Sequence, residues 1–199
     1  MLYNYPLNIE YPIDHYRQQY FDLYGNNLDA FDTYPEIYKN LAGYSIGGSK
    51  YEWGKDIVEE ALDLEVETCR IFVIDPQKIL PPHKDCVADS HDLRHCAVNI
   101  PLDNCDNGYN DWFNKSDYGE IYHSGGSAKV FEHYNFDLGK LKPDFRSRLS
   151  QPSLFRTDVF HSANNLDGVG RRVALSMRFK KNLTWEEMVE RARKFNEKV

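Results

Sequence analysis

The chain has 199 residues and a formal net charge of -7, and 41% of its residues are hydrophobic and 14% aromatic. These values exclude a disordered protein and predict one domain, residues 1–199, with a substantial buried core. The acidic balance provides no basic surface for nucleic acid, and no segment reaches the roughly 18 uninterrupted apolar residues of a membrane span.

The beginning of the chain indicates a cytoplasmic location, where cysteines are expected to stay reduced. The first residues lack a cationic start followed by an apolar run, which a secretory signal would need. Cys69, Cys86, Cys96 and Cys105 are scattered without a C-x-x-C pair. This spacing disfavours a zinc site and predicts buried, reduced thiols.

Residues 1–66 are predicted to wrap around a β core. Ile13–Tyr24 has the apolar spacing of a helix that ends at Gly25, and Asp56–Leu64 has the pattern of a second, shorter helix. The glycines of Gly43–Lys50 lack the ending of a phosphate-binding loop and are predicted to form a turn.

Residues 67–180 are predicted to form the core. Short runs of β-branched and aromatic residues alternate there with turn residues, which is typical of sandwiches and barrels and favours a jelly roll. Ser124–Ser127 is predicted to be a hairpin turn. The expected strands are Thr68–Ile74, His83–Cys86, Arg94–Leu102, Tyr109–Phe113, Glu120–His123, Ala128–Phe136, Ser153–Phe160 and Val173–Phe179.

Residues 181–199 are predicted to form a C-terminal helix. Thr184 and Glu187 have the spacing of a capping box, so the helix should begin there and run to about Asn196. The expected fold is therefore mainly β, a jelly roll with an N-terminal helical wrap and a C-terminal helix.

His83 and Asp85 stand two residues apart on a predicted strand, so their side chains should point to the same face. An imidazole and a carboxylate then converge on one point. Two histidines and one carboxylate, with open positions, are the ligand set of non-haem iron(II) oxygenases. His161, at the end of the later run Pro152–His161, supplies the second histidine.

The alternation of side chains over Arg172–Phe179 predicts that one face of this strand lines a cavity and carries a cation that binds a ligand. An arginine facing a cavity is costly unless paired, and its planar fork matches a carboxylate, so Arg172 is expected to bind a carboxylate-bearing ligand. Arg171 has the opposite parity and is the fallback. One face would carry Val173, Leu175, Met177 and Phe179, and the other Arg172, Ala174, Ser176 and Arg178.

The same parity applied to Arg94–Leu102 places His95, Ala97 and Asn99 on the cavity side. His95 and Asn99 would there hydrogen-bond a ligand or orient a metal-bound group, as partners of metal ligands do. The alternative is that each is a satisfied polar group of the core. A slip of the strand register by one residue would bring Arg94 to the ligand instead.

Four motifs together resemble the iron(II)/2-oxoglutarate-dependent dioxygenases, and within them the aspartyl/asparaginyl β-hydroxylase and proline-hydroxylase-like branch with its small phage and bacterial members. The resemblance covers roughly residues 71–179. The motifs are H-K-D at 83–85, R-H-C-A-V-N-I-P-L at 94–102, F-H-S-A-N-N at 160–165 and R-R-V-A-L-S-M-R-F at 171–179.

The resemblance implies a double-stranded β-helix, the cupin-like form of the jelly roll. It implies that iron(II) is held by His83, Asp85 and His161 and that the C5 carboxylate of 2-oxoglutarate lies against Arg172. The co-substrate pocket is expected to be completed by Ser176, Asn99 and His95. The implied reaction uses O2 to hydroxylate a C–H bond of a small molecule or peptide side chain, with conversion of 2-oxoglutarate to succinate and CO2.

Two other classes stay open. A cupin-type metalloenzyme would not use 2-oxoglutarate, and its only alternative ligand cluster would be His123 and His133 with Glu120 and Glu132. A non-catalytic jelly-roll binding or structural protein would hold no redox metal. The sequence defines neither the substrate nor the oligomeric state.

Overall fold

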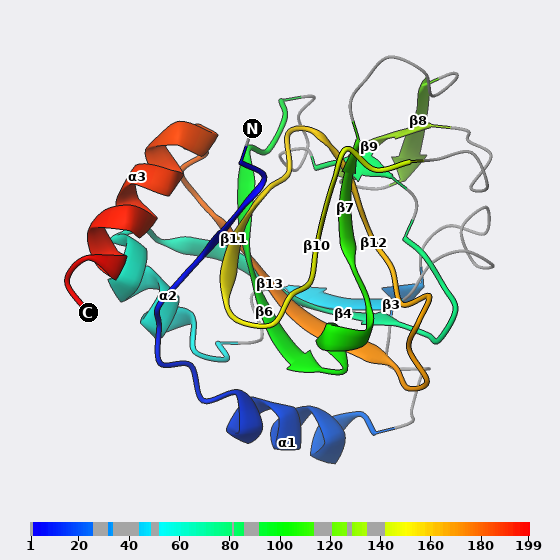
Figure 1. Ribbon diagram of the computed structural model, residues 1–199, viewed down its shortest axis with the longest axis horizontal. Coiled ribbons are helices and arrows are strands. Elements are labelled where there is room, and N and C mark those ends of the chain that lie inside the picture. Colours follow the sequence, from blue (N-terminus) through cyan, green and yellow to red (C-terminus); the bar gives the residue numbers. More distant parts are fainter. Residues whose placement is uncertain are drawn as a thin grey trace.

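The computed structural model describes residues 2–25, 32–33, 44–48, 52–80, 82–85, 92–113, 121–126, 129–134 and 142–199. Within these ranges the chain is mainly β, with two antiparallel sheets and a few helices (Figure 1). This architecture confirms the predicted jelly roll. The helices are α1 (Ile13–Leu23), α2 (Lys55–Leu62) and α3 (Trp185–Asn196), with a 3-10 turn at Cys105–Asn107.

The two sheets are built from strands far apart in sequence. In spatial order the larger consists of β1 (Asn4–Pro6), β11 (Ser153–Arg156), β6 (Cys96–Asp103), β13 (Arg172–Phe179), β4 (Val66–Ile74), β3 (Tyr44–Gly48) and β2 (Asp32–Thr33). The smaller consists of β10 (Phe145–Ser147), β7 (Asn110–Phe113), β12 (Phe160–Ala163), β5 (His83–Lys84), β9 (Lys129–Tyr134) and β8 (Ile121–Gly126).

The helices cover the apolar face of the larger sheet. Successive side chains of β13 alternate faces, and Val173, Leu175 and Met177 join one hydrophobic core with buried residues of α2 and α3. These two helices lie side by side against the sheet, and α1 contacts β6 (Figure 1). The opposite, more polar face of β13 is thereby directed towards the smaller sheet.

The predicted helices are confirmed, and their ends lie within two residues of the predicted positions. The structure also has the predicted capping box: the Glu187 backbone N–H donates to Thr184 Oγ1, and the Glu187 carboxylate accepts from the Thr184 backbone N–H. Cys69, Cys96 and Cys105 are buried free thiols, as expected, while Cys86 lies outside the described residues. Within the described ranges, no helix has the length and apolarity to cross a membrane.

The predicted strand Ser153–Phe160 is wrong, because the chain changes sheets in the middle of this run. β11 pairs with β6 in the larger sheet, whereas β12 pairs with β7 and β5 in the smaller one. Residues 157–159 connect them. Both halves have strand-like sequences, so composition alone does not reveal the crossing.

The predicted turn at Gly43–Lys50 is also wrong over its described part, since β3 pairs with β4 from Tyr44 opposite Val73 to Gly48 opposite Cys69. Pairing with a long neighbouring strand overrides the local preference of glycine for turns. The predicted hairpin is present as β8 and β9, but β8 continues to Gly126 and the connecting residues 127–128 lie outside the described chain.

Replacing the cap of α3 tests the local basis of this helix. Thr184→Ala removes the acceptor for the Glu187 backbone N–H, and we expect it to lower the free energy of unfolding by about 1 kcal/mol. Thr184→Ser keeps a hydroxyl cap and should stay within roughly 0.5 kcal/mol of the wild type. Urea unfolding of the three proteins measures both values, and equal losses in the two variants would contradict a role for the cap.

Candidate metal centre

The three side chains predicted to bind a metal lie together between β5 and β12. His83 on β5 is the direct cross-strand partner of His161 on β12, and their ring centroids are 4.5 Å apart. Asp85 follows β5 by one residue, and one potential ligand atom from each of the three residues lies within 4.8 Å of the others. The structure therefore brings together His83, Asp85 and His161.

His161 is held in the form that binds a metal. Its Nδ1 is 2.9 Å from the Val159 carbonyl oxygen, which only accepts, so Nδ1 carries the proton and Nε2 keeps its lone pair. Burial, together with the neighbouring His83, lowers the pKa of His161 to about 4. The imidazole is thus neutral near pH 7, with a free nitrogen for a cation.

Asp85 is a buried carboxylate with one paired and one unpaired oxygen. Both Nε, at 3.0 Å, and Nη2 of Arg178 donate to Oδ2. Burial raises the pKa of Asp85, but Arg178 together with the neighbouring His83 and His161 outweighs burial and holds that pKa well below the ordinary value. Oδ1 has no hydrogen-bond donor in the described structure, and its 3.5 Å separation from His83 Nε2 exceeds ordinary hydrogen-bond length.

An unpaired buried carboxylate oxygen costs free energy unless a cation or donor meets it. Oδ1 of Asp85 lies 3.5 Å from His83 Nε2, and the ligand atoms of the three residues lie close enough together to fit a divalent transition metal. The backbone fixes this arrangement: the Asp85 N–H donates to the Thr157 carbonyl at 3.0 Å, and the Arg94 N–H donates to the Asp85 carbonyl at 2.8 Å.

The triad lines a cavity between the two sheets with about 690 Å³ of empty space, counting its open mouth. The predicted cavity face of β13 lines it at every position, Arg172, Ala174, Ser176 and Arg178, and Asn99 of β6 lies on the same wall. Its apolar surface includes Phe72, Leu80, Leu149 and Phe155.

Arg172 is a buried cation that has no anionic partner in the described part of the chain. Its side chain is almost fully buried, and Nη2 donates to Asn110 Oδ1 at 2.8 Å. Among the described residues no carboxylate lies within ion-pair distance of it, and Nε has no hydrogen-bond acceptor. Burial lowers the pKa of Arg172, as it does for a cation whose charge is poorly compensated.

The two alternative arginines point elsewhere. Arg171 lies 3.0 Å from Asp75 and does not line the cavity. Arg94 donates to the Phe179 carbonyl and to Glu67, also away from the cavity. Of these candidates, Arg172 alone faces the cavity, in agreement with its parity on the strand.

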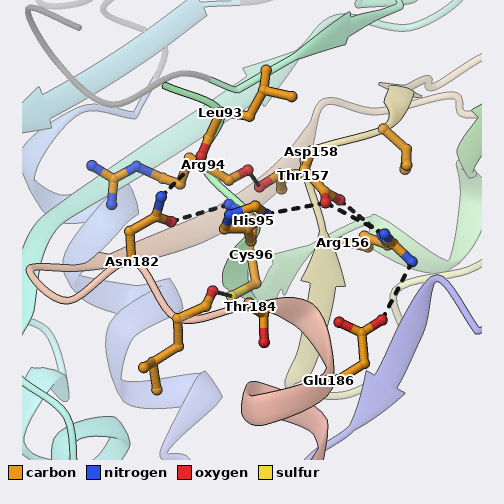
Figure 2. A network of polar contacts seen from close by, with 12 residues as sticks. Leu93, Arg94, His95, Cys96, Arg156, Thr157, Asp158, Asn182, Thr184 and Glu186 are labelled. Carbon is orange, nitrogen blue, oxygen red and sulfur yellow. Dashed lines mark hydrogen bonds and ion pairs between the residues drawn. The ribbon is translucent and has the colours of Figure 1, made fainter. Parts of the chain in front are cut away.

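His95 does not line the cavity, in contrast to its predicted place on the wall. β6 begins only at Cys96, so the alternation of the strand does not extend to His95. Its Nδ1 lies 3.1 Å from Asp158 Oδ2, and its backbone N–H donates to Asn182 (Figure 2). Arg156 holds the other Asp158 oxygen at 2.8 Å. This network joins the start of β6 to the segment before α3.

Sequence reasoning missed two residues of the cavity. Arg178 was placed on the right face without a role, because nothing in the sequence reveals its pairing with Asp85. Asn110 was not considered, although alternation in β7 places it with Trp112, the cross-strand partner of His161. The alternative cluster that includes His123 and His133 lies outside the residues whose side chains are described.

The topology and the triad define a jelly-roll protein with a candidate metal centre. No protein family and no curated protein matches the chain. Among solved structures it is similar to a Pseudomonas putida prolyl-4-hydroxylase, with TM-score 0.46 and 12% identity over 85% of this chain and 84% of that one.

It is also similar to two larger proteins. A point mutant of Bacillus subtilis oxalate decarboxylase gives TM-score 0.38 and 10% identity over 79% of this chain. Vicilin from hazelnut, Corylus avellana, gives TM-score 0.38 and 10% identity over 75% of this chain. The chain spans 29% and 31% of these proteins, respectively.

Removing the Arg178 charge tests whether a metal cation can bind next to Asp85. Arg178→Met leaves a buried carboxylate uncompensated, so the metal-free protein should lose roughly 3 kcal/mol of unfolding free energy. A divalent cation at the triad replaces the missing positive charge, and Mn(II) should therefore restore part of the loss. Urea unfolding with and without Mn(II) measures both effects.

Arg171→Met is the matched control, because Arg171 pairs with Asp75 where both side chains are 27% exposed. Its cost should stay below about 1 kcal/mol with or without the metal. If Arg178→Met loses the same free energy in both conditions, Asp85 does not face a cation site.

We expect the contact between His95 and Asp158 to make a pH-dependent contribution to the free energy of unfolding. Burial raises the pKa of Asp158, but hydrogen bonds from Arg156 and His95 outweigh it and lower that pKa. A depressed carboxyl pKa stabilises the fold above the unfolded-state pKa, and this stability is lost as the pH falls through the folded-state pKa.

We therefore expect Asp158→Asn to cost about 1 kcal/mol of unfolding free energy near neutral pH. The difference from the wild type should shrink as the pH falls below about 4, where the native carboxyl also takes up a proton. Urea unfolding across this range measures the difference, and a cost independent of pH would rule out the ionised Asp158 carboxylate as its source.

Proposed function

We propose that the protein is a non-haem iron(II) and 2-oxoglutarate-dependent oxygenase that hydroxylates a C–H bond of a small molecule or peptide side chain. One observation carries the proposal: the cavity that holds the triad also holds Arg172, a buried cation with no carboxylate partner among the described residues. A metal alone would use the triad but would not need Arg172.

His83, Asp85 and His161 would hold the iron, and three protein ligands leave positions for a chelating 2-oxo acid and O2. When bound, the iron and 2-oxo acid supply the oxidation of the substrate C–H bond by O2, with release of succinate and CO2. Arg178 keeps Asp85 ionised and holds its second oxygen, which leaves Oδ1 for the metal.

Arg172 would bind the distal carboxylate of the 2-oxo acid. A bidentate guanidinium–carboxylate pair is strong where water is excluded, and the ligand would supply the anion that the chain lacks. Ser176 and Asn99 lie on the same wall and are cross-strand partners. Apolar residues of the cavity, such as Leu149 and Phe155, would exclude water from the bound co-substrate.

The proposal is tested by separating metal binding from co-substrate binding. With Mn(II) and no O2, the wild type should bind 2-oxoglutarate in a calorimetric titration. Arg172→Leu should weaken this binding at least about 100-fold and leave Mn(II) binding intact, since a lost charge pair in a buried site costs roughly 3 kcal/mol. His161→Ala should lose Mn(II) binding.

Arg171→Leu is the control and should bind 2-oxoglutarate as the wild type does. With iron(II), ascorbate and O2, the wild type should also release succinate from 2-oxoglutarate. Metal binding without 2-oxoglutarate binding would instead identify a cupin-type metalloenzyme. Absence of both would identify a non-catalytic jelly-roll protein.

A further inference from the structure

We infer that Asn110 determines co-substrate selectivity: its amide N–H group makes the site accept a 2-oxo acid with a carboxylate tail and reject one with a carboxamide tail. The inference rests on the proposed function and adds to it a specificity residue on β7, in the sheet opposite Arg172. It is carried by a side chain with a fixed orientation and an unfilled buried donor.

The orientation of the Asn110 amide is set by Arg172. A guanidinium only donates hydrogen bonds, so the atom of Asn110 that lies 2.8 Å from Arg172 Nη2 must be the oxygen. Turning the amide by half a rotation would place its N–H group against another donor. Asn110 Nδ2 is therefore fixed as a donor that points away from Arg172 Nη2.

Two residues of the cavity lining each have a buried donor with no acceptor among the described residues. Asn110 is 5% exposed, and its Nδ2 has no hydrogen-bond acceptor in the described structure. Arg172 is 2% exposed, and its Nε also lacks an acceptor. Both residues line the cavity. Buried donors without acceptors are rare in folded proteins, and each indicates a missing partner.

A carboxylate and a carboxamide differ at this point. A carboxylate has two acceptor oxygens and no donor, so it can accept from the Asn110 N–H group and neutralise Arg172. A carboxamide has one acceptor oxygen, and its own N–H group would face a fixed donor. A site built around buried hydrogen-bonding groups rejects the wrong partner strongly, because those groups are then left unpaired.

The surrounding chain holds Asn110 and Arg172 in place. The next residue, Asp111, is clamped on the outer face of the strand by Arg146, with contacts of 2.6 and 2.9 Å. Gly108 packs against the stem of Arg172, where an added Cβ would lie 3.0 Å from Arg172 Cδ and 2.1 Å from the Asn164 carbonyl oxygen. The pair is thus pre-organised for a ligand.

The test exchanges the donor for an acceptor at constant shape. Asn110→Asp should pair its new carboxylate with Arg172 and present an acceptor where the amide N–H stood. The probes are N-oxalylglycine, a non-reacting 2-oxo acid analogue with a carboxylate tail, and N-oxalylglycinamide, its carboxamide counterpart. Binding to Mn(II)-loaded protein is measured by calorimetry, and Mn(II) binding is checked for each variant.

The wild type should bind the carboxylate probe at least about 100-fold more tightly than the carboxamide probe. In Asn110→Asp this preference should be lost or reversed, a change in the affinity ratio of at least about 100-fold. Asn110→Ala, which removes both donor and acceptor, should give an intermediate ratio. Asn107→Asp adds the same charge at an exposed neighbouring site and should keep the wild-type ratio.

The outcomes separate the two levels of the proposal. If the Mn(II)-loaded wild type binds neither probe, the proposed function fails and the inference fails with it. If the wild type binds N-oxalylglycine but the Asn110→Asp variant keeps the wild-type ratio, only the role of Asn110 is overturned. A reversed ratio with intact Mn(II) binding supports it.

Discussion

The alternation of side chains along β13 is the constraint on which the core and the candidate site both depend. One face closes the hydrophobic core beneath α2 and α3, and the other lines the cavity with Arg172, Ser176 and Arg178. β13 pairs with β4 on one side and β6 on the other, which fixes its register. A slip of one residue would bury arginines in the core and fill the cavity with apolar side chains.

This constraint explains which parts of the site could be predicted. Long strands with strict alternation place side chains reliably, so the preference for Arg172 over Arg171 agrees with the structure. The two-residue spacing of His83 and Asp85 is similarly local. His161 was found as a histidine at the end of a strand-like run, even though that run is two strands in different sheets.

The errors lie where long-range pairing decides the structure. His95 precedes β6, so whether the alternation includes it depends on where the pairing with a distant strand begins. The contact between Arg178 and Asp85 spans 93 residues of sequence, and the orientation of the Asn110 amide is set by a hydrogen bond from the distant Arg172. Which polar groups lack partners is a property of the folded chain and has no pattern in the sequence.

The cavity and the whole molecule differ in the sign of their charge. The chain carries a formal net charge of -7, yet its cavity wall presents Arg172 without a described anionic partner. The net negative charge of the protein repels an anionic ligand that is still distant. Inside the cavity, Arg172 attracts the ligand. Salt screens the long-range repulsion at separations beyond about 10 Å, but it has little effect on the attraction inside the buried cavity. Higher ionic strength therefore speeds the capture of such a ligand and leaves its release nearly unchanged.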